Sequence, residues 1–270
     1  YIEQDEPKGI AHAIRLCKEF VNDEKFLVFL GDNIIQKPII DFVQNFKNLD
    51  YDATVLLCEV DNPSRFGIAD IENGKILKIT EKPKNPTSNL AVTGIYLLSP
   101  IIFEIIDNLK PSWRNELEIT DALDNLLKQN NNISFEKITD YWKDTGTPED
   151  IIHANGEIIK KILESSGNKI TDHITGEGTI IESNVKIKGP VIIGRNCHIS
   201  LGSSIGPNVS IGDNTTISVS SIENSIIMKN CKINSVAEIK ESIIANNSEI
   251  KDEAGTEKVF LLGEGSKLSL

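Results

Sequence analysis

The sequence has few cysteines and no long apolar run. Its cysteines are widely spaced, with no CxxC pair and no spacing typical of a metal site: Cys17, Cys58, Cys197 and Cys231. We therefore expect reduced thiols in a cytoplasmic protein. Apolar stretches are all too short to span a bilayer, so a membrane-embedded chain is not predicted.

Basic residues are also in short supply. There are 28 Lys and Arg against 40 Asp and Glu, which gives a formal net charge of −12. Nucleic acid and anionic membranes would repel such a chain, so we expect neither as a partner. An anionic small substrate is compatible with this charge where a few cations or a metal ion lie in its site. The length of 270 residues suits one large domain or two ordinary ones.

Residues 1 to about 165 alternate short apolar runs with amphipathic stretches, the pattern of an α/β fold. The apolar run over residues 26–30 is followed by Gly31-Asp32-Asn33, which predicts a fully buried central strand ending in a loop. A second buried strand is predicted over 53–58 with a helix over 41–49 between them, so a parallel or mixed sheet is favoured. Further predicted elements are helices over 9–21, 118–129 and 149–163, a hairpin over 67–80 and a strand over 91–98.

From about residue 170 isoleucine recurs at a strict interval of six: Ile181, Ile187, Ile193, Ile199, Ile205, Ile211 and Ile217. The spacing slips between residues 218 and 224 and then resumes at Ile227, Ile233 and Ile239, followed by Ile244 and Ile250. Hexapeptide periodicity is typical of a parallel β-helix whose stacked isoleucines fill the inside. We therefore predict a left-handed parallel β-helix over residues 166–270, after an α/β domain over residues 1–165.

Two aspartates at the ends of predicted strands are candidates for a metal site. Asp32 follows the strand over 26–30, and ligands of open α/β sheets bind beyond the carboxyl ends of the strands. Asp144 lies in Trp142-Lys-Asp-Thr-Gly-Thr147, where aromatic residues leading into a D-T-G-T turn predict a strand end. Mg²⁺ usually takes one or two carboxylates together with phosphate oxygens. Taken singly, however, a turn or capping role is favoured for each aspartate.

Two loops carry candidate binding residues. Pro83 ends ladder pairing after the predicted hairpin and would hold Lys82 near the sheet edge, where its point charge suits a phosphate. The neighbouring Glu81 could accept hydrogen bonds from sugar hydroxyls. Gly9 precedes the first predicted helix, whose N-terminus favours an anion or a polar ring edge. An ordinary solvated loop and an ordinary helix entry explain these segments when each is taken alone.

Seven motifs taken in order resemble those of the sugar-1-phosphate nucleotidyltransferases. They are Gln4-x-x-Pro-x-Gly9-x-Ala11-x-Ala13, Leu30-Gly-Asp-Asn33, Phe66-Gly67, Glu81-Lys-Pro83, Ser88-Asn-Leu-Ala-Val-Thr-Gly-Ile-Tyr96, Glu116-Leu-Glu-Ile-Thr-Asp121 and Trp142-Lys-Asp-Thr-Gly-Thr147. The resemblance spans essentially the whole chain. It is closest to the long form of the glucose-1-phosphate thymidylyltransferases, in which a β-helix follows the catalytic domain. It implies a Rossmann-like mixed sheet of the glycosyltransferase-A type, with a nucleotidyltransferase domain over residues 1–165.

The resemblance implies nucleotidyl transfer from dTTP to glucose 1-phosphate, giving dTDP-glucose and pyrophosphate, by a homo-oligomeric enzyme. It implies that Asp32 and Asp144 bind Mg²⁺ and act with Lys82 in catalysis, while Gln4 and Gly9 contact the base. The other substrate-binding positions that it implies are Leu30, Gly67, Glu81, Val92, Thr93, Tyr96, Arg114 and Trp142. Metal and lysine charge would then offset the repulsion between two phosphate groups during in-line attack.

The sequence departs from the family pattern at two places. Family members open with a glycine-rich loop that bears an Arg and is followed by a Lys, whereas this chain begins at Tyr1, just before Gln4. We therefore expect the catalytic domain to lack that loop, and this chain alone to be inactive although the intact protein is active. Asn115 replaces the glycine usual before Glu116, which affects the expected turn and the placement of Arg114.

Three other functions remain as alternatives. A UTP-dependent sugar-1-phosphate uridylyltransferase is the nearest, because thymine and uracil differ by a methyl group. A hexapeptide-repeat acyltransferase would use His173 or His198 as a base, although His198 precedes the inward Ile199 and is predicted to face outward. A regulatory paralogue that binds a nucleotide sugar without catalysis is the third.

Overall fold

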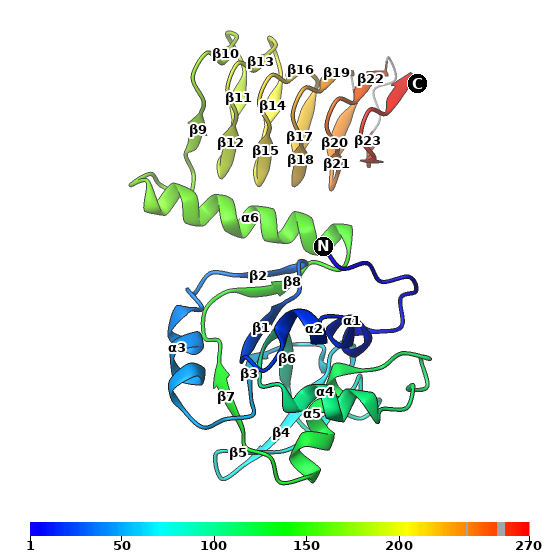
Figure 1. Cartoon of the computed structure of the whole chain (residues 1–270). Coiled ribbons are helices and arrows are strands. Elements are labelled where there is room, and N and C mark those ends of the chain that lie inside the picture. The colour runs from blue at the N-terminus through cyan, green and yellow to red at the C-terminus, as the bar shows by residue number, and fades with distance from the viewer. Residues whose placement is uncertain (236, 253–256, 270) are drawn as a thin grey trace. The chain divides into compact units, whose positions relative to one another are not determined.

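The computed structural model describes residues 1–235, 237–252 and 257–269. The chain forms two compact units, Tyr1–Asp144 and Thr145–Leu270 (Figure 1). The two units divide before helix α6 (Pro148–Ser165). The sequence analysis predicted the domain boundary after this helix, between residues 165 and 166. The helix packs within the second unit, so the limits of the catalytic domain stay a prediction. No helix among the described residues has the length and apolarity needed to cross a membrane.

The strands of the first unit are β1 (Phe26–Phe29), β2 (Asn33–Ile35), β3 (Ala53–Glu59), β4 (Ile68–Glu72), β5 (Lys75–Thr80), β6 (Leu90–Leu98), β7 (Ile133–Lys137) and β8 (Trp142–Asp144). The main sheet has the order β5-β4-β6-β3-β7, and β1 also pairs with β6. β3 and β7 run parallel, whereas β1, β3 and β4 run antiparallel to β6. A separate antiparallel ladder joins β2 to β8. The mixed α/β sheet predicted from the sequence is confirmed.

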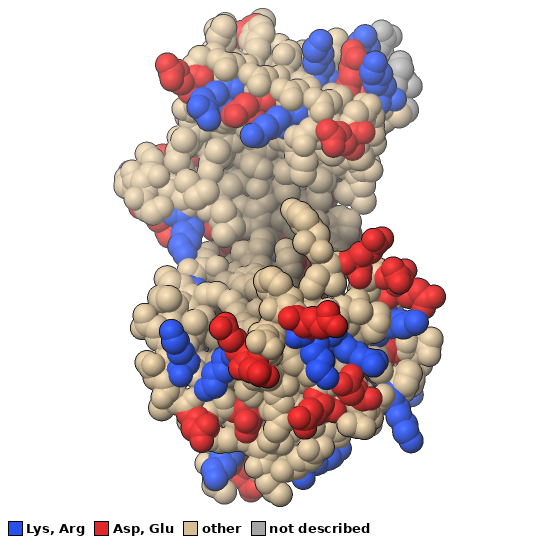
Figure 2. Space-filling view, viewed as in Figure 1, with Lys and Arg blue, Asp and Glu red and all other residues tan. Residues whose placement is uncertain are grey.

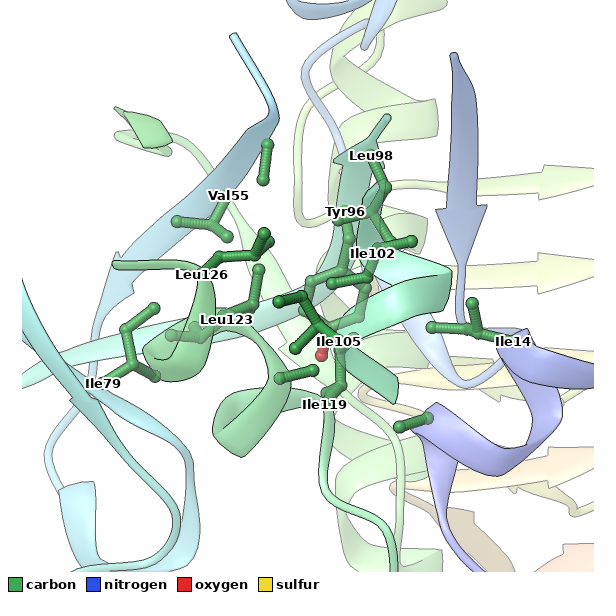
Figure 3. Close-up of a cluster of buried hydrophobic side chains, with 14 of the residues drawn as sticks. Ile14, Val55, Ile79, Tyr96, Leu98, Ile102, Ile105, Ile119, Leu123 and Leu126 are labelled. Atoms are coloured by element: carbon green, nitrogen blue, oxygen red, sulfur yellow. The ribbon is translucent and has the colours of Figure 1, made fainter. Parts of the chain in front are cut away.

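The helices of the first unit are α1 (Ile10–Leu16), α2 (Lys18–Val21), α3 (Ile40–Asn48), α4 (Ile101–Asp107) and α5 (Ile119–Lys128), with a 3₁₀ turn η1 (Pro63–Arg65). Successive side chains of a strand point to opposite faces of the sheet, so the long central β6 contributes to two cores. Tyr96 and Leu98 pack with residues of α1, α4 and α5 (Figure 3). Ile95 and Leu97 pack on the other face, against Phe42 of α3.

Strand β1 is not the fully buried central strand that its apolar run predicts. Among the described strands it pairs only with β6. Phe26 stacks on Phe103 with ring centroids 5.4 Å apart, but Leu27 and Phe29 are 39% and 41% exposed. An apolar run indicates side chains that tolerate burial, and it does not report how many neighbours the strand has. The prediction of central burial is therefore wrong for these residues of the described chain.

The second unit continues from α6 as a parallel β-helix with three faces (Figure 1). The first face contains β9 (His173–Thr175), β12 (Val191–Ile193), β15 (Val209–Ile211), β18 (Ser225–Ile227), β21 (Ile243–Ile244) and β24 (Leu261–Leu262). The second contains β10 (Ile180–Ile181), β13 (His198–Ile199), β16 (Thr216–Ser218), β19 (Lys232–Ser235), β22 (Glu249–Asp252) and β25 (Lys267–Ser269). The third contains β11 (Lys186–Ile187), β14 (Ser204–Ile205), β17 (Ser221–Glu223), β20 (Glu238–Lys240) and β23 (Glu257–Lys258). The predicted β-helix of hexapeptide repeats is confirmed.

The slip in the isoleucine spacing has a local cause. Ile217, Ile222 and Ile227 are separated by steps of five residues rather than six. All three are buried, and Ile222 pairs in register with Ile205 of the preceding coil. The connections between faces are therefore shorter by one residue, while each inward position keeps its isoleucine.

One corner of the β-helix is formed by asparagines in the left-handed backbone region. Asn196, Asn214, Asn230 and Asn247 have φ between 53° and 61°, where asparagine is favoured over most other residues that carry a Cβ. Asn214 Nδ2 donates to Asn230 Oδ1 at 3.2 Å, and Asn230 Nδ2 donates to Asn247 Oδ1 at 3.1 Å. Backbone conformation and side-chain ladder therefore both favour asparagine at this corner.

Replacing Asn230 should separate these two contributions. Asn230→Ala is expected to destabilise the second unit by about 1–2 kcal/mol through the left-handed backbone, with about 1 kcal/mol more from lost hydrogen bonds. Asn230→Gly loses the same hydrogen bonds but tolerates positive φ. Urea unfolding should therefore find the glycine variant more stable than the alanine variant by about 1 kcal/mol. Equal losses in the two variants would contradict the backbone explanation.

Candidate active site

A cavity of about 250 Å³ opens beyond the carboxyl end of β1, within the first unit. Ten of the predicted site residues line it: Leu30, Asp32, Gly67, Glu81, Lys82, Val92, Tyr96, Arg114, Trp142 and Asp144. They come from the ends of β1, β5 and β8, from the centre of β6, and from the segments before β4 and α5. Lining residues that were not predicted as site residues include Asn33, Arg65, Glu116, Glu118 and Thr120.

The short β2–β8 ladder brings the two predicted metal ligands together. Asn33 pairs in register with Asp144, the last residue of β8, and Asp32 immediately precedes Asn33. Both aspartates line the same cavity although they are far apart in sequence. The structure thus places Asp32 and Asp144 as the sequence analysis requires, while their binding of a metal stays a prediction.

The pKa of Tyr96, which lines this cavity, is affected by nearby carboxylates. Tyr96 lies in the middle of β6 and is 4% exposed. Burial is the main cause that raises the pKa of its phenol above the usual range, and the charges of Glu81, Asp32 and Asp144 raise it further. The charged form of this phenol is therefore disfavoured even more strongly than in water.

Three glutamates surround the guanidinium of Arg114. Its Nη2 lies 3.0 Å from Glu116 Oε1, and its Nη1 lies 3.4 Å from Glu81 Oε1 and 3.5 Å from Glu118 Oε1. Arg114, which is predicted to bind a phosphate, is thus held by three carboxylates. Asn115 has φ 61°, a left-handed conformation that glycine also adopts readily. Asn115 thus adopts a backbone conformation that a glycine at this position would also tolerate.

Glu81 is fixed by the start of α5. Thr120 Oγ1 donates a hydrogen bond to Glu81 Oε2 at 2.9 Å. Burial raises the pKa of Glu81 above its usual value, and the charge of Glu118 acts in the same direction. The hydrogen bond from Thr120 and the charges of Lys82 and Arg114 oppose this shift. A buried acceptor of this kind suits the hydroxyl groups of a neutral ligand.

Gly67 makes the contact between Glu81 and Thr120 feasible. A Cβ at Gly67 would lie 2.4 Å from Thr120 Cγ2 and 3.3 Å from Glu81 Oε2. Gly67→Ala should therefore destabilise the first unit by about 1–3 kcal/mol through overpacking. Adding Thr120→Ser removes Cγ2 but keeps the hydroxyl, so the double variant should recover most of the loss in urea unfolding. Additive losses from the two substitutions would show that this contact is not the cause.

Lys82 has an unusual backbone conformation. Its φ of 38° lies in the left-handed region, and it precedes Pro83. The backbone N–H of Lys82 donates to Phe66 O at 3.1 Å, and its Nζ lies 4.0 Å from Glu81 Oε1. Lysine rarely adopts positive φ, and such strain is concentrated at functional sites. The observation is consistent with the predicted role of Lys82 in the cavity.

Three predicted contact residues do not line this cavity. Thr93 lies in β6, is fully buried and does not line the cavity, so its contact with a ligand stays a prediction. Gln4 Nε2 lies 2.9 Å from His12 Nδ1, and a Cβ at Gly9 would lie 2.6 Å from Leu117 O. The close approach at Gly9 is thus to the chain itself, and contact of Gln4 and Gly9 with a base stays a prediction.

The two β-helix histidines have simple structural explanations. His198 Nε2 lies 2.6 Å from Glu182 Oε1, and both side chains are partly exposed on the outside of the coil, as predicted for His198. His173 is an exposed residue of β9.

The face shown in Figure 2 carries acidic and basic side chains interspersed over both units.

The balance of charge around the cavity favours a divalent cation. Five carboxylates line it (Asp32, Glu81, Glu116, Glu118 and Asp144) against three cations (Arg65, Lys82 and Arg114). A phosphate ligand would therefore meet an excess of negative charge. Asp32 and Asp144 supply the one or two carboxylates that Mg²⁺ prefers beside phosphate oxygens and water. Among the described residues, no group of three or more His, Cys, Asp or Glu side chains is arranged as a metal site.

Comparisons with known proteins agree with both units. Residues 1–161 match the family described as nucleotidyl transferase, and residues 187–269 match the GMPPB C-terminal domain. The low-salt glycan biosynthesis nucleotidyltransferase Agl11 of Haloferax volcanii is 39% identical over 282 residues, covering 100% of this chain and 79% of the relative. The glucose-1-phosphate thymidylyltransferase of Streptomyces antibioticus is 36% identical over 281 residues, covering 100% of this chain and 78% of the relative.

A solved structure of UDP-glucose pyrophosphorylase complexed with UDP-glucose is also similar. Its TM-score is 0.54 at 31% sequence identity, and the match covers 60% of this chain and 66% of that chain. The likeness extends to a protein that binds a uridine nucleotide, so it does not distinguish thymidine from uridine.

Proposed function

The chain belongs to the nucleotidyl transferase family, and from this premise we propose that the intact protein transfers a nucleotidyl group from dTTP to glucose 1-phosphate. A phosphate oxygen of the sugar phosphate attacks the α-phosphorus of the nucleotide. The new P–O bond forms as the bond to the β-phosphate oxygen breaks, so dTDP-glucose and pyrophosphate are the products. The thymidylyltransferase relative, 36% identical over 281 residues, supports this choice of substrates.

The observation that carries the proposal is the convergence of Asp32, Asp144 and Lys82 on one cavity at the sheet edge. The family generally uses a divalent metal, and Mg²⁺ held by Asp32 and Asp144 would offset the charge of the reacting phosphates. Lys82 binds the sugar phosphate, and Glu81 accepts hydrogen bonds from sugar hydroxyls. These residues bring two anions together and orient them, and an enzyme nucleophile is not required.

The remaining parts of the proposal follow from the family resemblance. Gln4 and Gly9 read the pyrimidine ring, and Arg114 is a second contact to phosphate once substrate competes with its carboxylate partners. We further propose a cytoplasmic homo-oligomer, in which the β-helix contributes to assembly. Open ends of a β-helix present unpaired backbone groups that a neighbouring surface can cover.

A uridylyltransferase is the second candidate, supported by the similarity to UDP-glucose pyrophosphorylase. A substrate panel distinguishes the two. The protein, carrying its natural N-terminus, is assayed for pyrophosphate release with dTTP, UTP, GTP and CTP, each crossed with several sugar 1-phosphates. We expect the highest kcat/KM for dTTP with glucose 1-phosphate. Preference for UTP would replace the first proposal by the second, and inactivity with every pair would favour a nucleotide-sugar-binding regulatory protein.

A further inference from the structure

Asn33 makes three hydrogen bonds in the candidate active site through its side-chain amide. It is the first residue of β2 and is 8% exposed. Its Oδ1 accepts hydrogen bonds from the backbone N–H of Gly94 at 2.9 Å and from Trp142 Nε1 at 2.8 Å. Its Nδ2 donates to Asp32 Oδ1 at 2.9 Å. One amide therefore joins Asp32 to the centre of β6 and to the start of β8.

The chain makes room for this amide at Gly94. A Cβ at Gly94 would lie 2.4 Å from Asn33 Nδ2 and 2.9 Å from Asn33 Oδ1, so only glycine permits the contact. The carbonyl oxygen of Gly94 accepts from Leu30 N at 2.8 Å, which fixes the chain just before Asp32. The same residue of β6 thus holds the loop after β1 at its carbonyl and Asn33 at its N–H.

Only an amide of this length meets the three requirements at once. Its oxygen has two lone pairs for Gly94 and Trp142, and its nitrogen supplies the donor that an ionised carboxylate needs. A leucine of similar size would offer neither group, and an aspartate would place an acceptor where Asp32 requires a donor. Because the two oxygens belong to one rigid carboxylate, the hydrogen bond to Asp32 Oδ1 also sets the direction of Oδ2.

We propose that Asn33 is a positioning residue, which sets the orientation of the Asp32 carboxylate and its separation from Asp144. The inference rests on the proposed function, because it assigns Asn33 a role in the site where those two carboxylates would bind a divalent cation. Residues that orient metal ligands typically affect metal affinity or activity by about 10- to 100-fold when they are replaced.

Mn²⁺ binding to this chain tests the inference without an activity assay. Mn²⁺ alone is titrated and free Mn²⁺ is followed by electron paramagnetic resonance in the wild type, Asp32→Asn, Asp144→Asn and Asn33→Ala. We expect Asn33→Ala to weaken binding at the site defined by the two aspartate variants by at least about tenfold. Asn45→Ala, which removes an exposed asparagine bonded to Glu136, is the matched control and should leave binding unchanged.

A second readout observes the hydrogen bond itself. The chain has two tryptophans, and Trp113→Phe assigns the indole N–H resonance of Trp142 in a ¹H–¹⁵N spectrum. Asn33→Asp keeps the acceptor for Trp142 and Gly94 but replaces the donor to Asp32. We expect its Trp142 resonance to stay in place, while kcat of the protein with its natural N-terminus falls at least about tenfold. The Trp142 resonance should shift in Asn33→Ala.

The outcomes separate the inference from the proposed function. If Mn²⁺ binding depends on Asp32 and Asp144 but stays within twofold in Asn33→Ala, the inference is overturned and the metal site stands. An Asn33→Asp protein with wild-type kcat would also overturn it. If wild-type Mn²⁺ binding does not depend on Asp32 and Asp144, the proposed metal site fails, and the role of Asn33 fails with it.

Discussion

Asp144→Asn is expected to lower the kcat of nucleotidyl transfer by about a hundredfold to a thousandfold. Asparagine has the size of aspartate and leaves the backbone pairing of Asp144 with Asn33 intact, so the first unit should remain folded. The substitution removes a negative charge from the one place where both predicted ligands meet. With one ligand of the proposed Mg²⁺ weakened, the cation would offset the charge of the two phosphate substrates less well in the transition state. Pyrophosphate release by the protein with its natural N-terminus measures the effect.

Asp140→Asn is the matched control for this prediction. Asp140 carries the same side chain four residues earlier, is exposed and does not line the cavity. Its replacement should leave kcat within about twofold, as expected for a surface substitution away from the site. An Asp144→Asn protein with kcat within tenfold of the wild type would show that this carboxylate is not a catalytic metal ligand.

Ile217→Ala is expected to destabilise the second unit by about 2–5 kcal/mol. Ile217 is fully buried and is stacked between Ile199 and Ile233 of the neighbouring coils. Its truncation removes apolar contacts and leaves a cavity that two adjacent coils cannot close without moving their backbones. Urea unfolding followed by circular dichroism measures the loss.

Ile180→Ala provides the comparison for the buried position. Ile180 lies on the same face of the β-helix, in β10, but is 60% exposed. Its truncation should change the free energy of unfolding by less than about 0.5 kcal/mol. Equal effects at the two positions would contradict the assignment of Ile217 to the inside of the coil.

The β-helix could be predicted from sequence because its period is strict. Most hexads carry one inward isoleucine, and even the five-residue steps around Ile222 keep that position buried. In the first unit, apolar runs and helix spacing also predicted β1, β3, α1, α3 and α5, whereas β2, β7 and α4 were not predicted.

Other features of the site depend on contacts that no local pattern carries. The apolar run of β1 does not show which strands pair with it. Arg114 pairs with the nearby Glu116 and Glu118, but its pairing with Glu81 joins segments more than thirty residues apart. Asn33 was visible only as part of a Gly-Asp-Asn turn, whereas its role depends on Gly94 and Trp142. Such roles follow from tertiary geometry rather than from sequence spacing.

Anomalous diffraction from Mn²⁺ tests the central claim most directly. Crystals of the protein with its natural N-terminus are grown with Mn²⁺, a non-hydrolysable dTTP analogue and glucose 1-phosphate. The account predicts an anomalous peak within coordination distance of both the Asp32 and Asp144 carboxylates, with Lys82 beside the sugar phosphate. A nucleotide bound with its metal held by other residues, or with Asp32 and Asp144 directed away from the phosphates, would contradict it.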